Sequence, residues 1–207
     1  LAEPSRILLI RPSALGDVCR SVAVLASLRA AYPAAQIDWL VQDVFADAVR
    51  HHPALHAVVE FPRKEHGLML KSLRARPVLR WLDALRKKKY DLVIDVQGLA
   101  RSGSFAWATG AARRVGFADA RELGWLGYNE RYSVESSLHA VEREMKLLEL
   151  AGIAPVRDLR LYTSAADRTW AEAALRSADA AGPICILAPT SRWEGKRWPI
   201  ERYAAVA

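Results

Sequence analysis

The chain has 207 residues, enough for one large α/β domain or for one domain and part of a second. Hydrophobic residues make up 52% of it, and no apolar run approaches the 18 residues of a membrane-spanning helix. The first residues lack the pattern of a signal peptide. The two cysteines lie far apart and match no metal-binding spacing, which predicts reduced thiols in a cytosolic protein without a metal site.

The formal net charge of +7 is concentrated in one segment. Residues 63–89 hold ten lysines and arginines against two acids, so the rest of the chain is close to neutral. Such a segment indicates either a solvated helix face or an anionic partner: nucleic acid, an acidic membrane surface or an acidic substrate. No homeodomain, zinc-finger or RNA-recognition signature is present, which argues against nucleic acid.

The first predicted elements are a strand, a polar turn and a helix. Ile7–Ile10 is a continuous apolar run, half of it β-branched, which is typical of a strand buried on both faces of a parallel sheet. Turn-forming Pro12, Ser13 and Gly16 follow, and apolar residues then recur at helical spacing over residues 18–28.

This turn presents Ser13, the backbone of Gly16 and the carboxylate of Asp17. In an open α/β sheet it lies at the carboxyl end of a strand, where ligands bind. An aspartate at a helix start is also commonly a cap. The turn has neither the G-x-x-x-x-G-K-[ST] nor the G-x-G-x-x-G spacing, so it predicts no mononucleotide or dinucleotide site.

The chain continues as alternating strands and helices. Further strands are predicted at residues 37–41, 57–61, 90–96 and 114–117. Helices are predicted at residues 45–49, at 68–89 with a break near Pro77, from Arg101, and at 139–150 with Gly152 as its C-cap. Residues 62–67 are expected to be a polar loop and residues 118–133 irregular. The β-α repetition predicts an α/β fold with a mostly parallel, doubly wound sheet.

A second unit is predicted after a connector at residues 153–163. Ser164 is expected to cap a helix that reaches Ala180, residues 184–187 to form a buried strand, and Pro199 to open a further helix. We therefore expect an N-terminal domain over residues 1–162, followed by a linker and the incomplete start of a second α/β domain over residues 163–207.

Four stretches occur in order along nearly the whole chain: Ile7–Val18, Asp91–Leu99, His139–Arg143 and Thr190–Pro199. With these stretches the chain resembles the lipopolysaccharide heptosyltransferases of glycosyltransferase family 9. Its D-x-Q-G-L form is most similar to the heptosyltransferase I type, the members that add the first heptose to the Kdo of the inner core.

The resemblance implies a GT-B fold, in which a Rossmann-like N-terminal half binds the acceptor and a second half binds the nucleotide sugar. It implies inverting transfer of heptose from the co-substrate ADP-heptose to Kdo-lipid A, the inner-core acceptor of lipopolysaccharide, with no other cofactor. It also implies a cytoplasmic location, peripheral to the inner membrane and next to its anionic surface, and no nucleic-acid partner.

The resemblance also implies roles for single residues. The catalytic aspartate of the S-x-x-G-D turn falls on Asp17, and the lysine of K-x-W-P, near the donor phosphates, falls on Lys196. Acceptor-side basic residues fall on Arg63, Arg101 and Arg121. The remaining substrate-binding candidates are Ser13, Gly16, Gln97, Thr190 and Ser191.

The residue chemistry fits this assignment. Inverting displacement needs a base for the proton of the acceptor hydroxyl and positive charge near the departing diphosphate. The arginine fork binds carboxylates, which an acidic acceptor carries.

Two alternatives stay open, because most of the donor half of the family lies outside these 207 residues. The first is a non-catalytic anion-binding module that retains only the acceptor half. The second is a transferase of the same fold that uses another sugar. We expect the 207-residue chain to be inactive by itself.

Overall fold

The computed structural model describes residues 3–71, 75–177, 182–191 and 194–206. The chain divides into two compact units, Leu1–Thr163 and Ser164–Ala207. Among the described helices, none is long and apolar enough to cross a membrane. Both Cys19 and Cys185 are free thiols.

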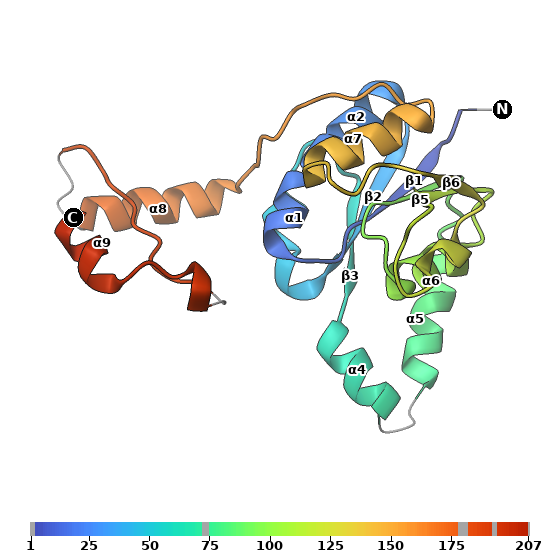
Figure 1. The fold of residues 1–207 in the computed structure, drawn as a ribbon, viewed down its shortest axis with the longest axis horizontal. Coiled ribbons are helices and arrows are strands. Elements are labelled where there is room, and N and C mark those ends of the chain that lie inside the picture. Colours follow the sequence, from blue (N-terminus) through green and yellow to red (C-terminus); the bar gives the residue numbers. More distant parts are fainter. Residues whose placement is uncertain (1–2, 72–74, 178–181, 192–193, 207) are drawn as a thin grey trace. The chain divides into compact units, whose positions relative to one another are not determined.

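A parallel sheet of six strands forms the first unit, in the order β3-β2-β1-β4-β5-β6 (Figure 1). The strands are β1 Arg6–Ile10, β2 Gln36–Gln42, β3 Ala57–Phe61, β4 Leu92–Asp95, β5 Arg113–Phe117 and β6 Glu130–Tyr132. Every neighbouring pair is parallel, so all six strands end at one edge of the sheet. The predicted α/β class with a parallel sheet is confirmed.

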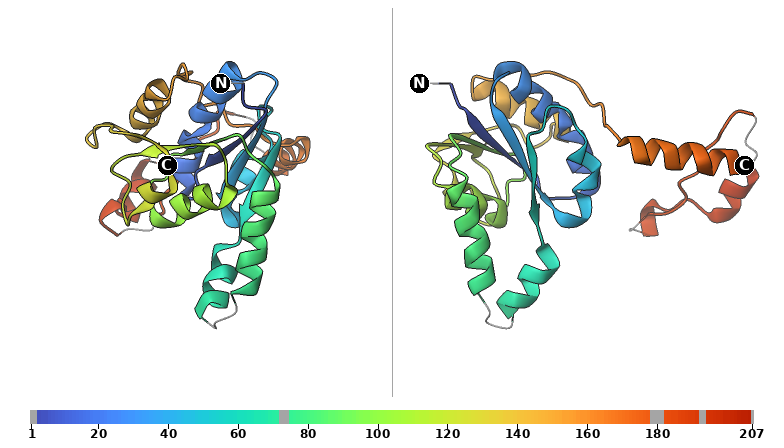
Figure 2. Two further views of the ribbon diagram at one scale, coloured as in Figure 1. Left: turned by 90° about the vertical axis from the view of Figure 1, so that its right-hand side faces the viewer. Right: turned by 180° about the vertical axis from the view of Figure 1, so that it is seen from behind.

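Helices cover both faces of this sheet, as expected for a doubly wound fold. They are α1 Leu15–Arg20, α2 Val22–Ala31, α3 Asp47–Arg50, α4 Arg63–Lys71, α5 Arg76–Lys87, α6 Ala100–Thr109 and α7 Ala140–Leu150, with short 3-10 turns η1 Asp43–Phe45 and η2 Gly124–Gly127. Helices α1, α2 and α7 lie on one face and α5 and α6 on the other (Figure 1). Helix α4 and the adjoining end of α5 project beyond the sheet (Figure 2).

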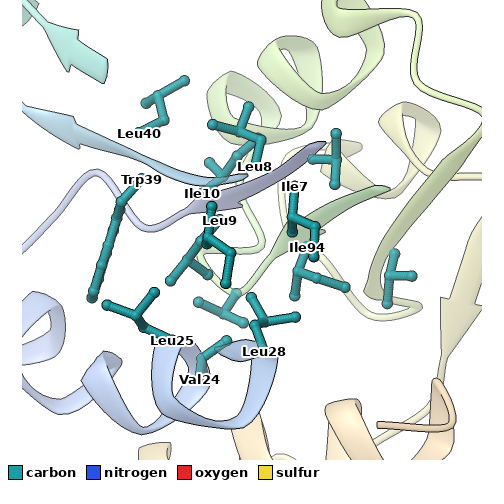
Figure 3. Packing of buried hydrophobic residues seen from close by; sticks show 14 of the residues in the cluster. Ile7, Leu8, Leu9, Ile10, Val24, Leu25, Leu28, Trp39, Leu40 and Ile94 are labelled. Atoms are coloured by element: carbon teal, nitrogen blue, oxygen red, sulfur yellow. The ribbon is translucent and has the colours of Figure 1, made fainter. Parts of the chain in front are cut away.

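The core is built around β1, whose residues Ile7–Ile10 are completely buried. Leu9 and Trp39 of the neighbouring strand point toward Leu25 of α2 (Figure 3). Complete burial of one such side chain stabilises a fold by about 1.5–3 kcal/mol. The strand that precedes the Asp17 turn is therefore anchored in the most tightly buried part of the molecule.

The apolar stripe of α5 matches the prediction: Val78, Trp81 and Leu82 are half-buried, and Leu85 is buried. The helix break lies just upstream of Pro77, which occupies the first turn of α5. Part of the basic segment, residues 72–74, falls outside the described residues.

Several predicted boundaries in the first unit are wrong. The loop expected at residues 62–67 is mostly helix, because Pro62 starts α4 by accepting the N–H of His66 at 3.0 Å. The segment expected to be irregular contains β6, which pairs with β5 through Gly116 and Arg131. The single helix expected over residues 18–28 is two helices, α1 and α2, which meet at Ser21, where the ψ angle of 1° departs from the helical value.

The second unit contains α8 Ala165–Ser177, η3 Glu194–Lys196 and α9 Ile200–Val206. Ser164 caps α8 as predicted, accepting the N–H of Asp167 at 3.0 Å. The predicted end of this helix at Ala180 lies outside the described residues.

The strand expected at residues 184–187 is not formed, and Ile186 is 88% exposed. A strand needs a neighbour for its backbone groups, and the described residues of this unit supply none. Helix α9 begins directly after Pro199, as predicted.

Candidate active site

The strand order places a crevice at the carboxyl ends of β1 and β4. The chain runs outward from β1 to β3 and then returns to the other side of β1 to form β4. Loops leave these two central strands in opposite directions, and ligands of open α/β sheets bind at such a point. The backbone N–H of Ser13, after β1, donates to Oε1 of Gln97, after β4, at 3.1 Å. Two predicted site residues therefore meet directly.

Asp17 is the third residue of α1, and its carboxylate forms ion pairs with two guanidinium groups. Its Oδ1 lies 3.1 Å from Nη2 of Arg20, and its Oδ2 lies 3.5 Å from Nη2 of Arg11. The side chain is 34% exposed, so the carboxylate is open to solvent. Oδ2 also accepts the N–H of Ala14, at a long 3.4 Å. Asp17 therefore makes a weak capping contact and is accessible to a ligand.

Gly16 does not form a special turn. It lies within the first turn of α1, and a Cβ built on it meets its nearest neighbour, Nη2 of Arg20, at 3.6 Å, an ordinary contact distance. Its carbonyl accepts the Nε–H of Arg20 at 3.1 Å. The backbone of Gly16 therefore helps to hold a guanidinium beside Asp17.

Arg11 is buried beneath Asp17, with 8% of its surface exposed. Its Nη1 donates to the carbonyl of Val96 at 2.5 Å, and its Nη2 lies 3.8 Å from Oε1 of Glu144. Neither Arg11 nor Glu144 was among the predicted site residues. The signal for Glu144 is its position: it falls beside Val141 and Met145 on the buried face of α7, where a carboxylate is unexpected.

Glu144 is 3% exposed. Its Oε1 accepts the hydroxyl of Ser21 at 2.8 Å, and its Oε2 is buried without a hydrogen-bond partner among the described residues. Burial, offset only in part by the positive charge of Arg11, raises the pKa of Glu144 to about 7. Glu144 therefore changes its charge near neutral pH.

Asp95, the last residue of β4, shapes the turn that carries Gln97. Its Oδ1 accepts the N–H of Gln97 at 2.8 Å, and its Oδ2 accepts the hydroxyl of Tyr128 at 2.6 Å. Burial raises the pKa of this carboxyl. Gly98 follows with a φ of +68°, which other residues rarely adopt. A buried hydrogen-bond network therefore fixes the conformation of the Gln97 turn. The D-x-Q-G motif contains Asp95, Gln97 and Gly98 of this network but not Tyr128.

Arg63 and Arg101 line one pocket of about 330 Å³ between α4, α5 and α6. The guanidinium of Arg101 lies 5.8 Å from the ring centre of Phe61. Burial, and then the positive charge of Arg63, lower the pKa of Arg101. Neither arginine has an ion-pair partner among the residues that the structure describes. Two unpaired guanidinium groups beside an aromatic ring are the kind of lining to which a carboxylate or phosphate binds in other proteins.

Arg121 lies in the loop after β5, on the same edge of the sheet. Its N–H donates to the carbonyl of Gly98 at 3.0 Å, which joins this loop to the Gln97 turn, and its side chain is exposed. Two glycine contacts hold the loop against α6. A Cβ on Gly103 would lie 2.1 Å from the carbonyl oxygen of Gly124, and one on Gly127 would lie 2.0 Å from that of Gly103. The backbones therefore touch directly.

The other predicted site residues belong to the second unit. Thr190 is exposed, Ser191 is half-buried, and its carbonyl accepts the Nε–H of Arg197 at 2.7 Å. Lys196 is exposed at the end of η3. The first unit thus brings together Ser13, Asp17, Gln97, Arg63, Arg101 and Arg121 at one sheet edge, whereas Thr190, Ser191 and Lys196 lie apart from it in the chain.

Comparisons with known proteins agree on one family. Residues 78–207 match glycosyltransferase family 9 (heptosyltransferase). Lipopolysaccharide heptosyltransferase 1 of Pseudomonas aeruginosa is 33% identical over 201 residues, which cover 94% of this chain and 54% of that protein. The Escherichia coli K12 protein of the same name is 32% identical over 148 residues, 69% of this chain and 46% of that protein.

Solved structures share the fold. The Escherichia coli heptosyltransferase WaaC with ADP-2-deoxy-2-fluoro heptose superposes with a TM-score of 0.76 at 26% identity, covering 97% of this chain and 64% of that one. A family 9 glycosyltransferase from Veillonella parvula superposes with a TM-score of 0.78 at 23% identity, covering 98% and 59%. The heptosyltransferase fold, of the GT-B type, is confirmed.

The chain spans about half the length of the curated relatives that it matches. The family match at residues 78–207 includes the Gln97 turn, and the Pseudomonas aeruginosa relative covers 94% of this chain. This chain therefore belongs to glycosyltransferase family 9, the heptosyltransferases.

Proposed function

We propose that this chain supplies the acceptor-binding half, and the beginning of the donor-binding half, of an enzyme that transfers heptose from ADP-heptose to the Kdo of the lipopolysaccharide inner core. The name of the Pseudomonas aeruginosa relative and the ligand in the WaaC structure support the donor and the acceptor. The observation that carries the proposal is the solvent-accessible carboxylate of Asp17 at the crevice between β1 and β4.

Asp17 is the general base of an inverting displacement. Its carboxylate takes the proton of the acceptor hydroxyl while that oxygen forms a bond to the anomeric carbon of heptose. The bond from this carbon to the diphosphate breaks on the opposite side, and ADP leaves with the electron pair. Lys196 stabilises the negative charge of the leaving diphosphate. ADP-heptose is a co-substrate in this scheme, and no metal or other cofactor takes part.

The acceptor binds through its acidic groups. Arg63 and Arg101 line one pocket and bind carboxylate or phosphate there, and the exposed Arg121 at the same sheet edge is a further candidate for an acidic group. Gln97 and Ser13, joined by a hydrogen bond, orient the acceptor sugar beside Asp17. On the donor side, Thr190 and Ser191 are hydrogen-bonding candidates for the diphosphate.

The basic segment at residues 63–89 faces the anionic surface of the inner membrane from the cytoplasmic side. Helices α4 and α5 expose Arg76 and Arg80 together with two apolar side chains, Leu68 and Leu79. Basic and apolar side chains exposed together are typical of helices that lie on a lipid surface. These exposed side chains support our proposal of a peripheral protein at the membrane, where a lipid acceptor would be found.

The test separates catalysis from capping, because asparagine caps a helix about as well as aspartate. Asp17→Asn should fold normally, bind the acceptor, and lose about 10²–10⁴-fold in turnover, the range typical of general-base catalysis. The assay uses ADP-heptose and Kdo-lipid A with a longer protein that contains this chain.

The opposite result identifies a cap. In that case Asp17→Asn leaves turnover unchanged, while Asp17→Ala lowers the free energy of unfolding by about 0.5–2 kcal/mol. A panel of other ADP-sugars and UDP-sugars distinguishes a transferase of another sugar. Acceptor binding without turnover of any donor indicates a non-catalytic anion-binding module.

A further inference from the structure

One guanidinium, that of Arg11, stands between two carboxylates of different character. Its Nη2 lies 3.5 Å from the solvent-accessible carboxylate of Asp17 and 3.8 Å from the buried carboxylate of Glu144. Its Nη1 is fixed on the carbonyl of Val96. Arg11 therefore has one firm hydrogen bond and two competing ion pairs, both of them longer than a strong charged hydrogen bond.

Glu144 is the partner whose charge varies. Its Oε2 is buried and has no hydrogen-bond partner among the described residues, a costly state for an ionised carboxylate. Its pKa is raised to about 7: burial is the largest cause, the negative charge of Asp17 adds to it, and Arg11, Ser21 and Arg20 oppose the shift. Near neutral pH, Glu144 is therefore both protonated and ionised in comparable amounts.

The groups that face Glu144 come from three neighbouring segments. The segment after β1 presents Arg11, and α1 presents Asp17 and Arg20. The neighbouring helix α2 contributes uncharged Ser27 at its contact with α7. His139, at the start of α7, is engaged with Arg20, its Nε2 lying 3.4 Å from Nη1 of that residue. Among these groups, Asp17 is the acid whose negative charge raises the pKa of Glu144.

We propose that Glu144 is a positioning residue for Asp17 and acts through Arg11. When Glu144 is ionised, it holds the Arg11 guanidinium toward the core, and the carboxylate of Asp17 stays open to the acceptor hydroxyl. When Glu144 is protonated, Arg11 has Asp17 as its only anionic partner among the described residues and closes onto it. The proposal rests on the general-base role of Asp17 for its catalytic consequence, but the coupling between the two carboxylates does not depend on that role.

The coupling is measured directly by NMR on the 207-residue chain labelled with ¹³C at its carboxyl groups. The Asp17 carboxyl signal should show an inflection near pH 7 that reports the titration of Glu144. This inflection should disappear in Glu144→Gln. It should persist in Glu149→Gln, an exposed control on the same helix. Since histidines titrate in the same range, His139→Gln is also made, and the inflection should persist in it.

A second variant keeps the test decisive if Glu144→Gln does not fold. Ser21→Ala removes the hydroxyl that donates to Oε1 of Glu144. A hydrogen bond to a charged group favours its ionised form, so its loss should move the inflection up by about one pH unit. The proposal is wrong if the Asp17 signal has no inflection near pH 7 in the native chain, or if Glu144→Gln leaves that inflection in place.

Turnover gives the functional readout in a longer protein that contains this chain. The native protein should lose activity as pH falls through about 7. The turnover of Glu144→Gln should not fall with pH in this range. At pH 8 it should be about tenfold lower than that of the native protein, with the KM for the acceptor changed less than about twofold. If the NMR coupling is present but Asp17→Asn is fully active, the general-base proposal fails and the coupling stands. If Asp17→Asn is inactive and the coupling is absent, only the inference about Glu144 fails.

Discussion

Glu144→Gln should change how the stability of the fold depends on pH. Glu144 has an ordinary pKa of 4.5 in the unfolded chain and about 7 in the folded protein. Between these values the folded state binds a proton that the unfolded state does not, so stability falls as pH rises. The stabilisation is complete below about pH 4.5 and is lost above about pH 7. The glutamine variant would have no such dependence, since an amide does not titrate.

The magnitude follows from the size of the shift. A difference of about 2.5 pKa units corresponds to about 3 kcal/mol. No allowance for solvent screening is needed, because Glu144 is 3% exposed. The free energy of unfolding of the native chain, minus that of the glutamine variant, should therefore fall by about 3 kcal/mol from pH 4.5 to pH 8. With a urea m-value of about 2 kcal/mol/M, the two unfolding midpoints move by about 1.5 M relative to each other.

Urea unfolding of both proteins across this pH range measures the difference, and the other carboxyl groups cancel in the subtraction. Glu149→Gln, the exposed control on α7, should differ from the native chain by less than about 0.5 kcal/mol at every pH. If Glu144→Gln differs from the native chain by the same amount at pH 4.5 and at pH 8, the reasoning is refuted. Glu144 would then be as solvated as an ordinary surface glutamate.

Three further outcomes are expected. Gly103→Ala places a Cβ 2.1 Å from the carbonyl oxygen of Gly124 and should lower the free energy of unfolding, measured with urea, by about 1–3 kcal/mol. The control Gly67→Ala has open space around it and should be neutral or stabilising. Equal stability of the two variants would show that the backbones do not touch at Gly103. The 207-residue chain alone should transfer no heptose and bind ADP-heptose weakly by calorimetry, and turnover by the purified chain would overturn this. Binding to anionic vesicles should weaken as salt rises, because exposed charges are screened over about 8 Å at physiological ionic strength. It should also weaken in the double variant Arg76→Gln, Arg80→Gln. If neither change weakens binding, a different surface of the protein contacts the membrane.

The position of most strands could be predicted because each is a short apolar run bounded by turn residues. Ile7–Ile10 lies within β1, and residues 57–61 coincide with β3. Parallel pairing then brings the ends of these strands to one edge without further information. For this reason the meeting of the Ser13 and Gln97 turns was implicit in the order of the elements.

The errors arise where an element depends on distant partners. β6 has only three residues, two of them charged, and exists because β5 lies beside it. Residues 184–187 have the composition of a strand but no neighbour in the described part of their unit. The role of Glu144 could not be predicted, because its contact with Arg11 crosses from α7 to the end of β1. The helical pattern shows that a carboxylate is buried on α7, but it does not show which distant residue pairs with it.

The glycine contacts between α6 and the loop after β5 have a consequence for ligand capture. Arg101 stands on α6, and Arg121 stands in the loop that ends at Gly124. Because the two backbones touch at Gly103, Gly124 and Gly127, little conformational freedom is left between the two arginine positions. An acidic ligand that engages both guanidinium groups would lose side-chain entropy but little backbone entropy. Much of the ordering that binding would otherwise require is completed when the chain folds.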